Sequence, residues 1–179
     1  MKHLKLSKEE ILNVFEWISV LFVSGYMTVY GIAKYVQFGS MEAYRLPVKD
    51  LEPMQLMWAF YSYSKPYVII IGIFEVLGAL LFLLPKTRII GGFLLTSILI
   101  NIILQDYFYE VMQGALAYAI LFQVLIMFVL FKHRARIKNA FEALKGQFTF
   151  KIRPIYILVA IFAVLCLEAL LFLFNQLLT

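Results

Sequence analysis

The sequence predicts an all-α integral membrane protein: an antiparallel four-helix transmembrane bundle followed by a fifth, C-terminal transmembrane helix. Three observations predict this class. Hydrophobic residues make up 63% of the 179 residues, whereas they make up about half of a soluble domain. The apolar residues are gathered in five runs, each about as long as the roughly 20 residues needed to cross a bilayer. Charged residues are only 15% of the chain and cluster between these runs. We therefore expect a single membrane domain over residues 1–179.

The predicted spans follow one another with short or basic connections. They cover about residues 11–37, 67–84, 89–108, 112–131 and 154–178. The first span follows a basic N-terminus and runs on without a small-residue cleavage pattern, so we expect it to be uncleaved. The joint 85–88 is so short that the second and third spans must lie antiparallel and in contact.

Small residues predict where the helices approach one another. Ser24, Thr28 and Gly31 share one face of the first span, and Gly72 and Gly78 lie on one stripe of the second. Small side chains let two helix backbones come close in a membrane. We expect these faces to be packed against protein rather than turned to lipid.

The segment 38–66 is the longest connection after the first span, and we expect an interfacial helix over about 51–62. Met54, Met57, Trp58 and Tyr61 would form one amphipathic face of that helix. Trp and Tyr favour the membrane interface. We prefer an interfacial anchor, and the alternative is a lid over the mouth of the bundle.

The basic residues predict the orientation. Twelve of the sixteen Lys and Arg residues lie on the side of the N-terminus, the 85–88 joint and the basic segment 132–153. Cytoplasmic loops carry an excess of Lys and Arg. We therefore predict a cytoplasmic N-terminus, an external C-terminus and a bacterial inner-membrane location. The run from Lys132 to Lys138, which includes His133, is interpreted as a solvated anchor to anionic headgroups, and Glu16 as an acidic residue near the cytoplasmic edge.

Polar side chains inside the spans are the candidate functional residues, because such groups are costly at membrane depth unless they face protein or a cavity. Their positions place them together in the outer half of the bundle. The candidate ligand-binding residues are Tyr26, Tyr30, Lys34, Glu75, Asn101, Gln105 and Asp106.

Two interpretations of this polar group stay open. Lys34 is the obvious cation for Glu75 or Asp106, and the group could be an internal clasp that orients the helices. It could equally line a pocket for an amphipathic ligand or a quinone that enters from the outer leaflet.

The stretch from Val20 to Phe131 resembles the DoxX family of small four-span membrane proteins. The resemblance rests on WAFYSYSKPYVIIIGIFEVLGALLFLLPKTRIIGGFLLTSILINIILQDYFYEV, with Gly72 and Glu75 in a Gly-x-x-Glu pattern, a Pro-x-Thr-Arg turn, and the pair Asn101 and Asp106. It implies a four-helix bundle. Founding members are associated with a thiosulfate:quinone oxidoreductase, others with redox-linked membrane complexes, and distant animal relatives with receptor assembly. This chain departs from the pattern by its fifth span.

The functional expectation is an outer-facing intramembrane pocket that binds a quinone or a lipid in an accessory, non-enzymatic role. The alternatives are a subunit of a quinone-linked oxidoreductase complex, with membrane or redox partner proteins, and a scaffold for partner membrane proteins. Cys166 is the single cysteine, so thiol exchange within the chain has no partner. No metal site is predicted, and quinone is the one candidate cofactor. The lipid bilayer is the expected surrounding, and nucleic acid is not an expected partner because the cations flank the spans.

Overall fold

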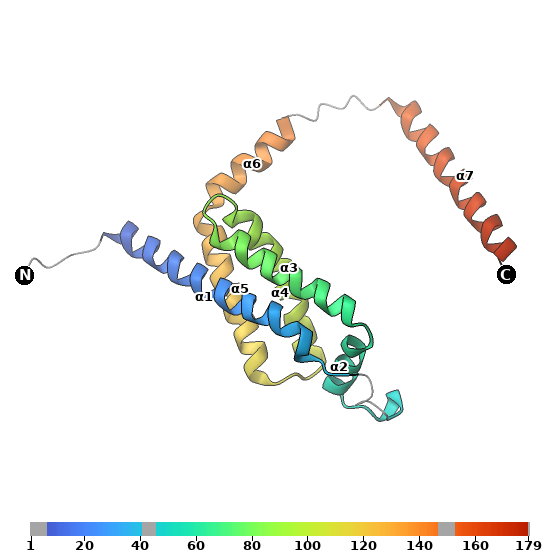
Figure 1. Ribbon diagram of the computed structural model, residues 1–179. Helices are drawn as coiled ribbons and strands as arrows, with labels where there is room; N and C mark the ends of the chain where they lie inside the picture. Colours follow the sequence, from blue (N-terminus) through green and yellow to red (C-terminus); the bar gives the residue numbers. More distant parts are fainter. Residues whose placement is uncertain (1–6, 41–45, 147–152, 179) are drawn as a thin grey trace, which may run out of the picture. The chain divides into compact units, whose positions relative to one another are not determined.

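The computed structural model describes residues 7–40, 46–146 and 153–178, and all regular structure in these ranges is helical (Figure 1). Four helices are long and apolar enough to cross a membrane. They are α1 (Lys8–Gln37), α3 (Lys65–Leu83), α4 (Arg88–Phe108) and α5 (Gln113–Lys132). Their bounds agree with the first four predicted spans to within three residues. The prediction of four such helices is confirmed.

The other elements are a short 3-10 helix (Val48–Asp50) and the helices α2 (Pro53–Tyr63), α6 (Arg134–Gly146) and α7 (Pro154–Leu178). Contacts divide the chain into two units, Met1–Ile137 and Lys138–Thr179, and each is described by itself. In the second unit α7 is helical over the whole of the predicted fifth span. That α7 crosses a membrane, and that the two units form one domain, stay predictions.

Local sequence signals account for the helix ends. Ser7 caps α1 in a capping box, in which its hydroxyl accepts from the Glu10 amide and its own amide donates to the Glu10 carboxylate. Pro66 lies in the first turn of α3, where its missing N–H costs nothing. After α3, Pro85 opens the turn to α4, and the Thr87 hydroxyl donates to the Leu81 carbonyl at 2.9 Å. This tight turn holds the start of α4 against the end of α3.

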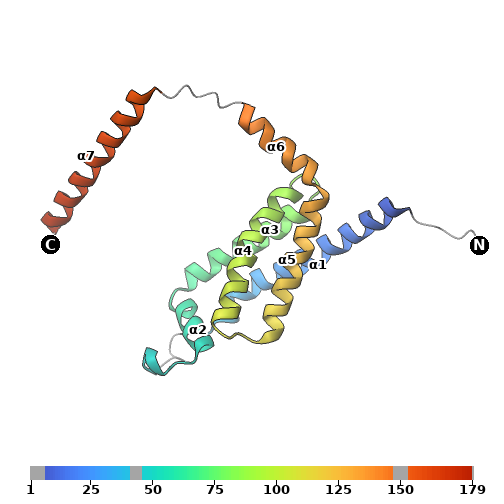
Figure 2. The same cartoon turned by 180° about the vertical axis from the view of Figure 1, so that it is seen from behind.

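The four long helices surround one core, with α1 against α3, α3 against α4, α4 against α5 and α5 against α1. Both views show them side by side, with α2 at the end where α1 finishes and α3 begins (Figures 1 and 2). Met27, Phe82, Leu95, Leu99 and Phe122 are the largest apolar side chains of this core. Many large apolar side chains also point outward from these helices. Such an apolar exterior suggests a lipid bilayer environment.

The most extensive contact is between α1 and α3, and glycine makes it possible. A Cβ atom on Gly31 would lie 2.6 Å from the Gly72 carbonyl oxygen, so the two backbones touch at this point. Nearby, the Ser24 hydroxyl donates to the Ala79 carbonyl at 3.1 Å. The prediction that these small-residue faces are packed against protein is confirmed.

Candidate functional site

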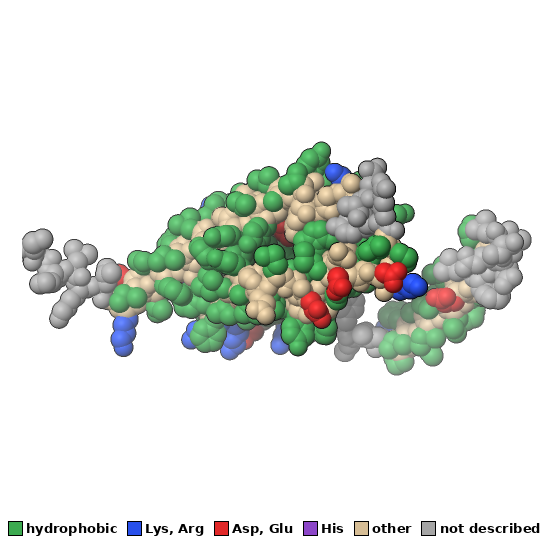
Figure 3. Space-filling model, turned by 90° about the horizontal axis from the view of Figure 1, so that it is seen from below, with side chains coloured by type: hydrophobic (Ala, Val, Ile, Leu, Met, Phe, Trp, Pro, Cys, Tyr) green, Lys and Arg blue, Asp and Glu red, His purple; other side chains and the backbone are tan. Residues whose placement is uncertain are grey.

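A cavity of about 810 Å³ lies among α1, α2, α3, α4 and α5. Most of its wall is apolar, and includes Ile71, Phe74, Leu94, Ile98 and Phe122. The space-filling view shows a hollow among hydrophobic side chains, with an acidic side chain inside it (Figure 3). Six of the seven predicted site residues line the cavity: Tyr30, Lys34, Glu75, Asn101, Gln105 and Asp106. The structure therefore brings together groups that are up to 76 residues apart in the sequence (Tyr30 to Asp106).

Glu75 and Lys34 form the charged centre of this cavity. The Lys34 Nζ atom lies 3.3 Å from Glu75 Oε1, and it also donates to Gln37 Oε1 at 3.1 Å. The Glu75 side chain is fully buried. Neither of its oxygens accepts a hydrogen bond from any residue in the described part of the chain. Its contact with Lys34 is therefore an ion pair by distance without the geometry of a hydrogen bond, and the carboxyl group keeps acceptor capacity to spare.

Several further polar groups of the cavity belong to α4, and one of them contacts α2. The Tyr61 hydroxyl, from α2, donates to Gln105 Oε1 at 2.7 Å. Burial raises the pKa of Tyr61, so its phenol stays protonated and remains a donor. Asp106 is largely buried, whereas Asn101, one turn earlier, is exposed. With Lys34, Glu75 and Asp106 ionised, the cavity would carry one positive and two negative charges.

Helix α2 covers one end of the cavity. Met54, Met57, Trp58 and Tyr61 all line it. Met57 and Tyr61 are buried, and they pack in a second apolar cluster with Phe38, Val68 and Val111. The face of this helix that carries these four residues is therefore turned to the bundle. This placement fits a lid over the cavity, and an anchoring role of the same helix at a membrane interface stays a prediction.

Tyr26 is the predicted site residue that does not line the cavity. Its ring stacks on Tyr118 with centroids 5.9 Å apart and lies 5.3 Å from the Phe122 ring. Tyr26 belongs to an aromatic seam between α1 and α5. Farther along the same pair of helices, Phe15 and Phe128 meet edge to face at 4.8 Å. Helices α1 and α5 are thus in contact along this seam. Tyr30 of α1 and Ala115 of α5 line the cavity.

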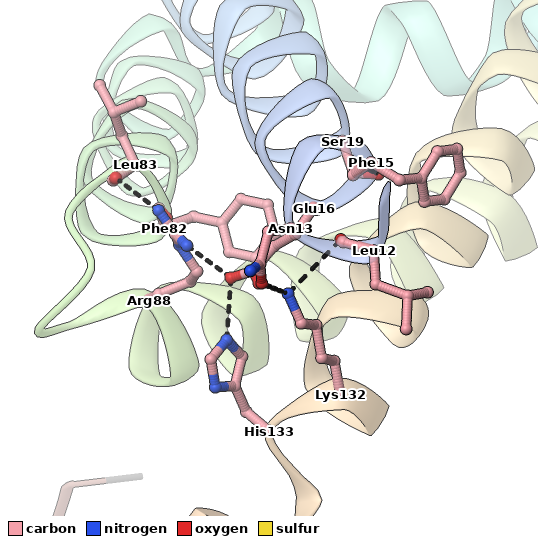
Figure 4. Close-up of polar contacts among 10 residues, drawn as sticks. All are labelled: Leu12, Asn13, Phe15, Glu16, Ser19, Phe82, Leu83, Arg88, Lys132 and His133. Atoms are coloured by element: carbon pink, nitrogen blue, oxygen red, sulfur yellow. Dashed lines mark hydrogen bonds and ion pairs between the residues drawn. The ribbon is translucent and has the colours of Figure 1, made fainter. Parts of the chain in front are cut away.

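A second polar cluster lies at the other end of the four helices, around Glu16 (Figure 4). The Glu16 carboxylate accepts from Arg88 Nη1 and from Lys132 Nζ, each at 2.5 Å, and lies 2.8 Å from His133 Nε2. Lys132 also donates to Asn13 Oδ1 at 2.6 Å. The cluster ties α1, α4 and α5 together where both Glu16 and Arg88 are buried.

This cluster corrects the interpretation of the basic segment. Lys132 and His133 were expected to be a solvated anchor, but both contact Glu16. The physical reason is that a buried carboxylate needs cations and hydrogen-bond donors around it. One signal in the sequence could have found the cluster, because Glu16, Arg88 and Lys132 all fall at the same predicted depth. Arg134 and Lys138, beyond the cluster, are exposed as expected.

Fold and site together define a helical protein with four candidate membrane-spanning helices, a largely apolar cavity with a few polar groups at one end of them and an ion-pair cluster at the other. The chain is similar to "Uncharacterized protein YwoB" of Bacillus subtilis (strain 168), at 29% identity over 124 residues, which cover 68% of this chain and 79% of that protein. No protein-family model matches the chain. No solved structure matches it either. The resemblance to the DoxX family stays a prediction.

Proposed function

We propose that this protein is an integral membrane protein that binds a hydrophobic or amphipathic small molecule, such as a lipid or a quinone, in an accessory role. The cavity supports this by its size, because small-molecule sites typically enclose roughly 300–1,000 Å³. Its lining supports it as well, since such sites combine apolar walls with a few placed polar groups. Of the residues that carry the DoxX resemblance, Glu75, Asn101 and Asp106 all line the cavity.

The observation that carries the proposal is the hydrogen-bond deficit of Glu75. A clasp that served only to hold helices together would satisfy both carboxyl oxygens, because an unsatisfied buried polar group costs stability. Neither Glu75 oxygen accepts a hydrogen bond in the described structure, although the Lys34 ammonium lies 3.3 Å from one of them, and the residue lines a cavity. A bound molecule would supply what the protein leaves out.

The proposal includes a topology. The four long helices form an antiparallel bundle and α7 adds a fifth span. The N-terminus lies in the cytoplasm of a bacterial cell, the protein lies in the inner membrane, and the cavity opens toward the outer side. The charge distribution supports this orientation, with twelve of sixteen cations on the predicted inner side.

The test is native mass spectrometry of the gently extracted protein, with a cavity-filling variant and a matched control. Ala115 and Ala117 are both exposed positions of α5, two residues apart, but Ala115 lines the cavity and Ala117 does not. We expect wild type and Ala117→Trp to carry the same small-molecule adduct, and Ala115→Trp to lose it.

Equal adducts in all three proteins would contradict the proposal, because the molecule would then bind elsewhere. A stoichiometric protein partner without a small molecule would instead favour the role of a complex subunit.

A further inference from the structure

We infer that the polar head of the bound molecule is a hydrogen-bond donor, a hydroxyl or an amine, held by Glu75. The inference rests on the proposed function and names the class of ligand. It excludes heads that only accept hydrogen bonds, such as esters and oxidised quinones, and heads that carry negative charge.

The first step is the acceptor capacity of Glu75. A carboxylate accepts hydrogen bonds at both oxygens, and a protonated carboxyl group still accepts at its carbonyl oxygen. In either protonation state, at least one Glu75 oxygen therefore needs a donor. Within the described residues no donor is within hydrogen-bonding geometry of either oxygen. A ligand hydroxyl or amine meets this need in both states.

The second step is the state of the protein's own groups. The Lys34 ammonium donates one of its three protons to Gln37 at 3.1 Å, and none of the three is in hydrogen-bonding geometry with Glu75. The Gln105 oxygen, which could receive a ligand donor, is taken by Tyr61. An acceptor-only head could accept from donors of the lining such as Asn101, but it would leave the Glu75 deficit in place. Such a deficit in a buried group costs free energy.

The third step is charge. The cavity holds the side chains of Lys34, Glu75 and Asp106, so its acidic groups outnumber its basic group. A phosphate or carboxylate head would add a negative charge next to a fully buried carboxyl group, which is unfavourable in a medium of low dielectric constant. A neutral hydroxyl adds no charge, and an ammonium would offset the second acidic group. The apolar remainder of the wall accepts the tail.

The experiment uses three probes with the same tail: dodecylamine, dodecanol and methyl dodecanoate, of which only the ester lacks a donor. Each is titrated into Ala117→Trp and Ala115→Trp proteins in the same detergent, and the difference in occupancy by native mass spectrometry gives cavity binding. Partition into detergent and adventitious surface binding contribute equally to the occupancy of both variants, so they cancel in this difference.

We expect the amine and the alcohol to bind in the cavity about tenfold more tightly than the ester, which corresponds to about 1.4 kcal/mol. Glu75→Gln, combined with Ala117→Trp, should reduce this preference severalfold, because a glutamine amide offers its own donor to the ester. If Glu75→Gln does not fold, the inference is tested by the three probes alone, through their relative cavity binding in the Ala117→Trp protein.

The outcomes separate the inference from the proposed function. Cavity binding in which the ester equals or exceeds the other probes overturns the inference and leaves the binding function standing. Probe binding that is the same in Ala115→Trp and Ala117→Trp, or no binding, overturns both.

Discussion

The Lys34 ammonium lies 3.3 Å from the Glu75 carboxyl group and joins the last turn of α1 to the middle of α3. The pair lies close to the point at which Gly31 and Gly72 bring the two backbones into contact. The side chain of Lys34 is 12% exposed and that of Glu75 is fully buried. The pair is therefore largely withdrawn from solvent, and its energetics should be those of a buried ion pair.

Removing one charge of this pair should cost more than removing both. Lys34→Met leaves a buried carboxyl group without its cation and should destabilise the protein by roughly 3–5 kcal/mol. Adding Glu75→Gln should recover part of that loss, which thermal unfolding in detergent would measure. Asp106→Asn is the comparison and should rescue Lys34→Met less, because Lys34 is within ion-pair distance of Glu75 and not of Asp106 in the described structure. Additive losses in the Lys34/Glu75 double variant would show that the two groups are not coupled.

The contact between α1 and α3 should tolerate no side chain at Gly31. A Cβ atom there would lie 2.6 Å from the Gly72 oxygen and 2.8 Å from Val76 Cγ2. Gly31→Ala should therefore cost about 1–3 kcal/mol through overpacking. Gly25, on the same helix, has no atom within 4 Å of its added Cβ, so Gly25→Ala should be neutral or stabilise by up to about 1 kcal/mol. Equal unfolding temperatures for the two variants would contradict the close approach.

The cluster around Glu16 should be a main determinant of stability at the other end of the bundle. Glu16→Gln leaves Arg88 and Lys132 without their shared carboxylate and should cost roughly 3–5 kcal/mol. Glu142→Gln is the matched control, because Glu142 pairs with Lys138 at 3.6 Å with both side chains more than half exposed. That change should cost at most about 1 kcal/mol. Similar losses in the two variants would mean that the Glu16 cluster is solvated.

Tyr61 should connect the lid to the cavity through one hydrogen bond. Tyr61→Phe removes the hydroxyl that donates to Gln105 and should cost about 0.5–1.5 kcal/mol. Tyr63 is 80% exposed on the same helix, and Tyr63→Phe should change stability by no more than about 0.5 kcal/mol.

The same residue predicts a dependence on pH. Burial raises the pKa of Tyr61 above its ordinary value of 10.0. The folded state therefore holds this proton more tightly than the unfolded state. The resulting stabilisation is complete below pH ~10 and is lost as the pH rises through the folded value. Unfolding curves should show wild type losing stability more steeply than Tyr61→Phe above pH ~10, and parallel curves would contradict the buried position.

The proposed orientation is testable by labelling. In a Cys166→Ser background, a cysteine at Ser40 should react with an impermeant thiol reagent in intact cells, because Ser40 lies on the predicted outer side. A cysteine at Lys138 should react only after the cells are permeabilised. Labelling in intact cells of the cysteine at Lys138, without labelling of the one at Ser40, would contradict the proposed orientation and indicate the opposite one.

The sequence alone was sufficient for the four long helices and for six of the polar residues that line the cavity. Helix length and apolar composition are set by the thickness of the bilayer, so the spans could be located without any tertiary contact. Polar residues inside a span must face protein, so Lys34, Glu75, Asn101, Gln105 and Asp106 could be expected to converge. Small residues at helical spacing similarly predicted the face on which Gly31 and Gly72 meet.

The tertiary structure decided which side chains within reach of one another make contact. Glu16 meets Arg88 and Lys132 across 72 and 116 residues of sequence, and sequence spacing carries no information on the rotation of one helix about its axis relative to another. For the same reason Tyr26, on the same predicted face as Tyr30, lies on the aromatic seam and not in the cavity wall. The lid position of α2 depended on the apolar cluster that Met57 and Tyr61 join, because an amphipathic face is equally suited to a membrane interface and to a protein surface until packing selects one.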